Sequence, residues 1–131
     1  MLNMYDYLIE QIDSIVTCYS DEYSQDKESA ENGAKVYPYC TITMYSAIPN
    51  NEYSNNNLCY IDVWSNQHGI AEVETLTDAI YKKLNKLTID KDDMFIQITR
   101  YNPCRLNIND PDINLKRRQL RFLVKTYEKN Q

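Results

Sequence analysis

The spacing of apolar residues changes several times along the chain, and each change predicts an element. From about Leu2 to Tyr19 the apolar positions recur every three or four residues, which predicts an amphipathic helix. From Leu58 to Ser65 they alternate with polar or aromatic residues, and from about Ala71 to Leu87 they again recur every three or four. A strand is therefore expected to lead directly into a second helix.

Three more segments alternate with the period of two that is typical of strands: residues 36–48, 94–101 and 118–127. In the first, Cys40, Ile42 and Met44 are expected to share one side of the strand. The element order is then α-β-β-α-β-β, which predicts an α+β fold. We expect a mainly antiparallel sheet of four or more strands, with two helices packed on one face.

The segments between these elements lack periodicity. Residues 20–35 are rich in acids and Ser and predict a mobile loop, and residues 102–116 carry two Pro and predict a long turn or a projecting hairpin. The short stretch 89–93 is expected to turn the chain. A chain of 131 residues is large enough for one core, so we expect residues 1–131 to form a single domain.

Catalytic chemistry finds little support in the sequence, and we expect no enzyme. The only His, His68, lies in a strand-to-helix connection, where its stretch more simply supplies turn geometry and helix capping. Two Gly are too few for a phosphate-binding loop. The cysteines, which lack a Cys-x-x-Cys pair, are expected to be free and largely buried rather than metal ligands: Cys18, Cys40, Cys59 and Cys104. No cofactor and no membrane span are expected.

Charge is distributed unevenly. The net charge of −5 argues against a general nucleic-acid binder. Residues 1–34 hold eight acids and one Lys, whereas residues 116–131 hold six basic residues and one Glu. Two interpretations stay open: both regions form solvated faces, or identical subunits meet head to tail, acidic region against basic region.

Twelve Tyr stand against two Phe and one Trp. Tyr and Trp combine a large apolar area with a polar tip and are enriched at protein contacts. Several of them fall on a sheet face that no predicted helix has to cover, which favours assembly with other proteins. We expect Asp62 to form an ion pair or a backbone hydrogen bond at a subunit contact. The candidate interface residues are Tyr39, Tyr45, Tyr60, Asp62, Trp64, Arg117, Arg118 and Arg121.

Several short stretches carry a resemblance: the N-terminal amphipathic helix, "VYPYCTITMY", "YIDVWS" with the helix after it, and "RRQLRFLVKTYE" at the end. With these features the chain resembles the tail terminator and tail completion proteins of long-tailed bacteriophages and phage-derived contractile particles. The resemblance implies a structural protein, made in the host bacterial cytoplasm, that forms a homohexameric ring in the virion tail or neck. Such a ring caps the tail tube, ends its growth, and receives the head connector or neck protein, and possibly the sheath.

Two alternatives stay open. One is a neck or head-closure protein of the same particle. The other is a small cytoplasmic α+β binding module or enzyme with a pocket near Asp62, Trp64 and His68.

Overall fold

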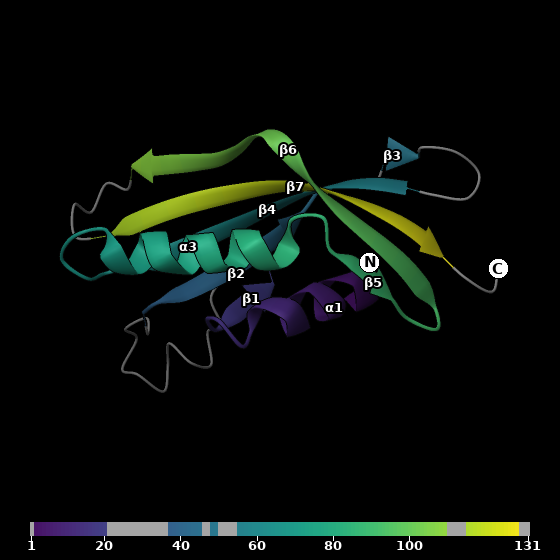
Figure 1. Ribbon diagram of the computed structural model, residues 1–131, viewed down its shortest axis with the longest axis horizontal. Helices are drawn as coiled ribbons and strands as arrows, with labels where there is room; N and C mark the ends of the chain where they lie inside the picture. Colours follow the sequence, from purple (N-terminus) through teal and green to yellow (C-terminus); the bar gives the residue numbers. More distant parts are fainter. Residues whose placement is uncertain (1, 21–36, 46–47, 50–54, 110–114, 129–131) are drawn as a thin grey trace.

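A computed structural model describes residues 2–20, 37–45, 48–49, 55–109 and 115–128 of the chain. These residues form two helices and seven strands (Figure 1). In chain order the elements are α1 (Leu2–Ile12), β1 (Cys18–Ser20), β2 (Tyr39–Met44), β3 (Ile48–Pro49), β4 (Asn55–Ser65), α3 (Ala71–Leu84), β5 (Thr88–Asp90), β6 (Met94–Asn109) and β7 (Lys116–Glu128).

The strands form one sheet in the order β1-β2-β4-β7-β6-β5, and β3 pairs with β4 outside this row. β1 runs parallel to β2, and every other pair is antiparallel. The expected α+β class and its two helices are confirmed. The sheet is mixed rather than purely antiparallel, and the short strands β1, β3 and β5 add to the predicted order.

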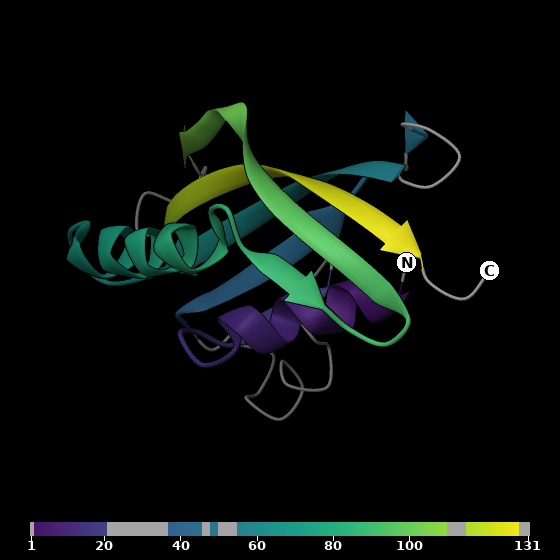
Figure 2. The ribbon, with the colours of Figure 1, turned by 45° about the vertical axis from the view of Figure 1, so that its right-hand side comes forward.

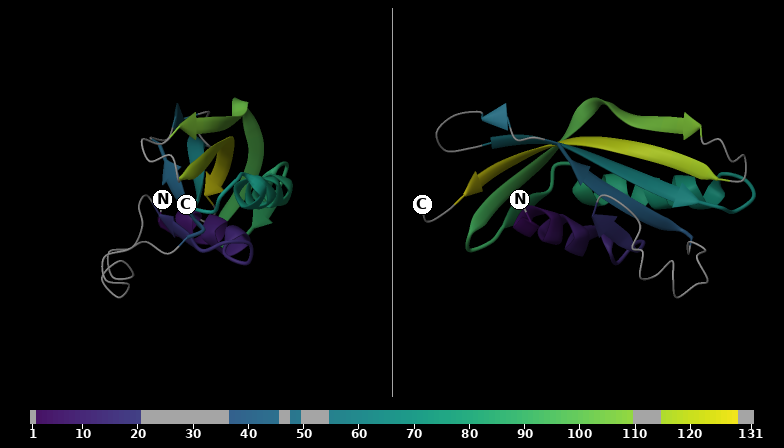
Figure 3. Two further views of the ribbon diagram at one scale, coloured as in Figure 1. Left: turned by 90° about the vertical axis from the view of Figure 1, so that its left-hand side faces the viewer. Right: turned by 180° about the vertical axis from the view of Figure 1, so that it is seen from behind.

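The sheet curls around the two helices, which both lie on one side of it (Figures 2 and 3). Met4, Leu8 and Ile12 of α1 are buried in the same core as Val73, Ile80 and Leu84 of α3. Alternate residues of the strands complete this core. They are Cys40, Ile42, Cys59, Ile61, Val63, Met94, Ile96, Ile98, Leu120, Phe122 and Val124. The period of two thus predicted the core face of each of the four long strands.

The first helix ends at Ile12, earlier than the apolar rhythm predicts. The carboxylate of Asp13 accepts a hydrogen bond from the backbone N–H of Cys18 at 3.2 Å, which closes a turn and directs Cys18–Ser20 along β2. Val16 and Cys18 are buried although they lie outside the helix. Apolar residues that follow a helix into the core extend the helical pattern, so the sequence alone placed the end of the helix too late.

Residues 102–109 continue β6, and Lys116 begins β7, so strands flank the segment on both sides. The pairing of β6 with β7 shifts register between Arg100 and Arg105, around a cis bond that precedes Pro103. This arrangement is a hairpin rather than a long turn; its residues 110–114 lie outside the described residues. The expected loop 20–35 also lies outside them, except for Ser20, which ends β1.

Three of the four cysteines, Cys18, Cys40 and Cys59, are buried, and Cys104 is half-buried. All four are free thiols, as the sequence predicted. Neither described helix is long and apolar enough to cross a membrane.

A candidate subunit interface on the open face of the sheet

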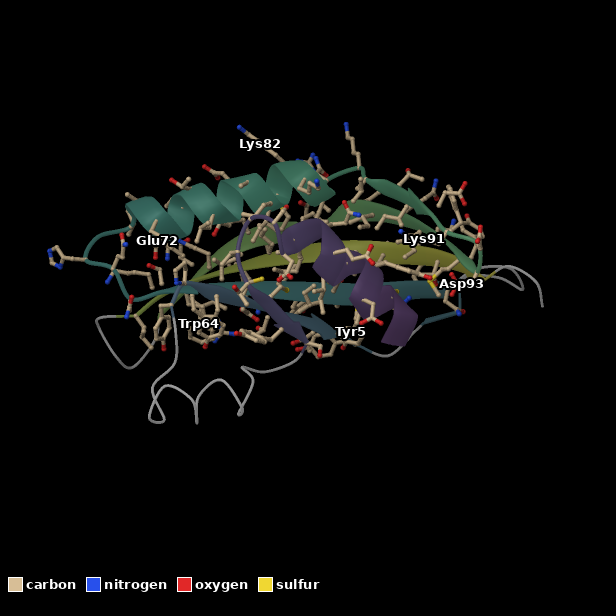
Figure 4. The ribbon with its side chains drawn as sticks, turned by 90° about the horizontal axis from the view of Figure 1, so that it is seen from below. Tyr5, Trp64, Glu72, Lys82, Lys91 and Asp93 are labelled. Atoms are coloured by element: carbon tan, nitrogen blue, oxygen red, sulfur yellow. The ribbon has the colours of Figure 1, made fainter. Side chains whose placement is uncertain are left out.

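The sheet side that faces away from α1 and α3 carries large side chains from neighbouring strands. We refer to this side as the open face, because neither described helix covers it; in Figure 4 its residue Trp64 and helix α3 lie on opposite sides of the strands. Its members alternate with the core residues of β2, β4, β6 and β7. They are Tyr39, Thr41, Thr43, Asn56, Leu58, Tyr60, Asp62, Trp64, Phe95, Gln97, Thr99, Leu106, Ile108, Arg117, Gln119, Arg121, Leu123, Lys125 and Tyr127.

Aromatic rings pack against each other on this face. Tyr39 is the cross-strand neighbour of Trp64, and their rings are nearly parallel, with centroids 6.0 Å apart and an interplanar angle of 13°. Tyr19 and Tyr37 also contact the ring of Tyr39. Tyr39 is therefore only 3% exposed, whereas Trp64 is half-buried. Such rigid contacts fix the positions of these rings at little further cost in side-chain entropy.

Arginines from β7 lie over the aromatic residues of β4. The guanidinium of Arg117 stacks over Trp64, with its central carbon 4.6 Å from the ring centroid, and Arg121 lies at the same distance from Tyr60. The register explains the pairing, because Trp64 is opposite Arg117 and Tyr60 is opposite Arg121. Each pair forms a cation–π interaction, which becomes stronger when water is excluded.

Asp62 lies between these two pairs and is 6% exposed. Its Oδ1 atom accepts hydrogen bonds from Nε of Arg117 at 3.0 Å and from Nε2 of Gln119 at 3.1 Å. Gln119 in turn accepts a bond from Nε of Arg121 at 3.0 Å. The carboxylate charge is thus compensated within the chain, and the expected ion pair of Asp62 is intramolecular.

The structure brings together six of the eight candidate interface residues on the open face: Tyr39, Tyr60, Asp62, Trp64, Arg117 and Arg121. Tyr45 follows β2 directly; its side chain is 47% exposed, and its ring meets that of Tyr60 at 4.8 Å. Their role at an interface stays a prediction.

Arg118 does not lie on the open face. It neighbours Arg117 in a strand, so its side chain points to the helix side, where Nε contacts Oε1 of Glu74 at 2.5 Å. Glu74 also binds Arg105 of β6 at 2.6 Å, and Arg105 pairs with Asp78 as well. This group of charges joins α3 to the β6–β7 hairpin.

Two contributors were missed by reasoning from the sequence. Gln119 is in phase with Arg117 and Arg121, so the strand period alone could have placed it on the open face. Arg105 had no such signal, because Pro103 and the neighbouring polar residues indicate a turn rather than a strand.

His68 is exposed in the connection before α3, where Gly69 adopts a positive φ of 89°. The expected capping of α3 by this stretch is wrong, because the N-cap residue is Ile70, without a side-chain capping bond. Instead, Oγ of Ser65 donates to Oε1 of Glu72 at 2.7 Å and ties β4 to the first helical turn. Among the described residues, no group of three His, Cys, Asp or Glu side chains is placed to hold a metal ion.

No protein-family model and no curated protein sequence matches this chain. Its fold is similar to that of a chain in a solved structure described as the virion of a native gene transfer agent (GTA) particle. The two chains superpose with a TM-score of 0.63 at 10% sequence identity, over 92% of this chain and 91% of the other. At this identity the likeness is one of fold, and it extends over nearly the whole of both chains.

Proposed function

We propose that this protein is a structural component of a phage-like particle, and that it acts as a tail terminator. Two observations support the proposal from different directions. The short stretches of sequence resemble tail terminator proteins, and the fold resembles that of a chain in a gene transfer agent virion over nearly its full length.

The observation that carries the proposal is the open face itself. Trp, Tyr and Arg are the residue types that dominate binding energy at protein contacts, and here they form one ordered array. The side chains are already held by stacking and by hydrogen bonds to Asp62 and Gln119. A contact made by pre-ordered side chains loses less conformational entropy on binding.

In the proposed mechanism, copies of the chain form a homohexameric ring through this face. One surface of the ring binds the last layer of the tail tube protein and blocks further growth. The other surface receives the head connector or neck protein, and possibly the end of the sheath. Its place in the particle is then the tail or neck.

A neck or head-closure protein of the same particle is the second candidate, since the same open face would serve a ring at that position. The enzyme alternative near Asp62, Trp64 and His68 has weaker support. Asp62 is engaged by Arg117 and Gln119, which makes it a poor general base, and His68 is exposed. His68→Asn should leave particle assembly intact, whereas loss of function with an unchanged fold would favour an enzyme.

The direct test is to purify the full chain and examine it by light scattering and negative-stain microscopy. We expect six-membered rings. The rings should then be added to the particle's tube protein while it polymerises, and we expect them to bind tube ends and to stop elongation. Rings that bind the connector but not the tube would identify a neck protein. A chain that stays monomeric and binds neither would contradict the proposal.

A further inference from the structure

Exposed acids cover the outer side of α1. Asp6 and Glu10 are exposed, and they point away from the core because the helix buries Met4, Leu8 and Ile12 on its other side. Asp13, which follows the helix directly, is exposed as well.

The turn between β5 and β6 lies beside this helix (Figure 1). Tyr7 of α1 donates a hydrogen bond to Asp93 at 2.6 Å, and Lys91 contacts Glu10 at 3.6 Å. The turn adds further acids to the same surface. The acidic face is then defined by Asp6, Glu10, Asp13, Asp92 and Asp93, with Lys91 among them.

The open face has the opposite charge. Arg117, Arg121 and Lys125 lie on it, against two acids: Asp62 of β4, and Asp90 of the edge strand β5, which is paired with Phe95. Lys125 lies over the ring of Tyr127, with Nζ 5.5 Å from the centroid. Three basic side chains thus stand against two acids, so the surface keeps a small excess of positive charge.

These two faces cannot meet within one chain, because the hydrophobic core and the sheet lie between them. Met4 and Leu8 of α1 pack into the core from one side, and the side chains of the open face leave the sheet on the other. We propose that the acidic face of one copy docks on the open face of the next copy. The proposal rests on the self-association put forward above, and it names the two surfaces that meet.

A second copy fits the open face better than other partners do. Two open faces placed against each other would bring Arg121 and Lys125 close to like charges, which disfavours a symmetric pair. Nucleic acid is a less suitable partner, because its phosphates would be repelled by a chain with a net charge of −5. A contact between two different surfaces repeats from copy to copy, and it closes into a ring when the rotation between copies allows it.

Charge reversal on one face at a time tests the proposal. One variant carries Asp6→Lys and Glu10→Lys, and the other carries Arg121→Glu and Lys125→Glu. None of these four side chains is buried. Each variant should form few or no rings at low salt, with a dissociation constant for assembly raised by at least roughly tenfold. Part of the loss should recover at high salt, where repulsion is screened.

The decisive variant carries all four substitutions. Its charges are exchanged between the two faces, so it should assemble with itself again. An equimolar mixture of the two single-face variants should also assemble, as a ring of alternating copies. Lys82→Glu with Lys83→Glu is the control for a changed net charge, because these residues lie at the exposed end of α3 and Lys82 points into solvent (Figure 4).

Circular dichroism establishes that each variant is folded. For any variant that unfolds, the neutral changes Asp6→Asn, Glu10→Gln, Arg121→Gln and Lys125→Gln replace the reversals, and a weaker salt dependence of assembly is expected. The docking proposal alone fails if the wild-type chain forms rings and the fourfold variant does not. It also fails if Asp6→Lys with Glu10→Lys assembles normally. A wild-type chain that stays monomeric, or that binds duplex DNA through Arg121 and Lys125 instead, overturns both this proposal and the proposed ring.

Discussion

Arg117 lies over the indole ring of Trp64, with its guanidinium carbon 4.6 Å from the ring centroid. The same guanidinium binds Asp62 at 3.0 Å, so its position is fixed from two directions. On its other side Trp64 stacks with Tyr39. Trp64 is thus the centre of a row of stacked side chains that crosses β2, β4 and β7.

Replacing Trp64 by Ala should weaken assembly much more than folding. Trp64 is half-buried in the isolated chain, so its removal leaves a shallow gap rather than a core cavity. At a subunit contact, by comparison, deleting a central Trp costs about 2 kcal/mol or more of association energy. Sedimentation measures the association, and urea unfolding of the monomer measures the fold.

Tyr101→Ala provides the matched control, since Tyr101 is an aromatic residue of β6 that is 42% exposed. We expect little change in either measurement for this control. If Trp64→Ala unfolds the monomer as strongly as it weakens assembly, Trp64 is a core residue and the interface lies elsewhere.

Asp62 should stabilise the folded monomer through its charge. Its Oδ1 atom accepts bonds from Arg117 and Gln119 in a nearly buried position. Hydrogen bonds to charged groups contribute about 1.5–3 kcal/mol, so Asp62→Asn should lower the free energy of unfolding by about that amount. Chemical denaturation of the monomer measures this loss.

A double-mutant cycle measures how much the interaction between Asp62 and Arg117 contributes to stability, apart from the other contacts of each residue. Asp62→Asn and Arg117→Gln should each destabilise the fold, and the double variant should lose less than the sum of the two. Strict additivity would mean that the ion pair contributes nothing to stability. Thr43→Ser, a small change on the same face, serves as a control for general disturbance of the sheet.

The sequence predicted the long strands well because alternation is a local signal. Cys40, Ile61 and Leu120 all point into the core as the period of two requires. Arg118 was misplaced for a physical reason: it was grouped with Arg117 and Arg121 by charge, although neighbouring residues of a strand point to opposite faces. The strand period of two therefore predicted the face of Arg118 better than its position among other basic residues did.

Other features depend on contacts between distant parts of the chain. The stacking of Arg117 on Trp64 follows from the register of β4 and β7, which no local pattern specifies. The short strand β1 follows a run with helical periodicity. It forms only because its backbone pairs with that of β2, with Cys18 next to Cys40. Arg105 reaches Glu74 across 31 residues of sequence, through a strand that Pro103 concealed.

The cysteines should differ strongly in their reaction with an alkylating reagent. A hydrogen bond with Cys18, together with burial, raises the pKa of the Cys40 thiol, and burial raises the pKa of the Cys59 thiol. The thiolate is the reactive form, so both should be protected in the folded protein. Cys104 is half-buried and should react first, as mass spectrometry of the alkylated chain would show.

Cys104→Ser is the matched variant and should remove the fast phase of alkylation. Cys40 and Cys59 should then react only when denaturant unfolds the chain. Alkylation of Cys40 in the native protein at the rate of Cys104 would show that β2 separates readily from the sheet.

Glu74 should hold the β6–β7 hairpin against α3. Its carboxylate contacts both Arg118 and Arg105, and the Arg118 side chain is only 10% exposed. Glu74→Gln removes the negative charge that faces these two guanidinium groups. The loss destabilises the fold mainly through Arg118, which is the more buried of the two. We expect a loss of about 1–2 kcal/mol in the free energy of unfolding, because the side chain of Glu74 itself is 35% exposed and partly screened by solvent.

Asp78 provides the comparison within the same group of charges. It pairs with Arg105, but its side chain is 58% exposed, so Asp78→Asn should change stability by less than about 1 kcal/mol. Hydrogen exchange adds a local measurement: in Glu74→Gln the amides of β6 near Arg105 should exchange faster, while those of β2 should not change. Equal effects of the two substitutions, or no local change in exchange, would show that packing of α3 on the sheet, rather than Glu74, positions the hairpin.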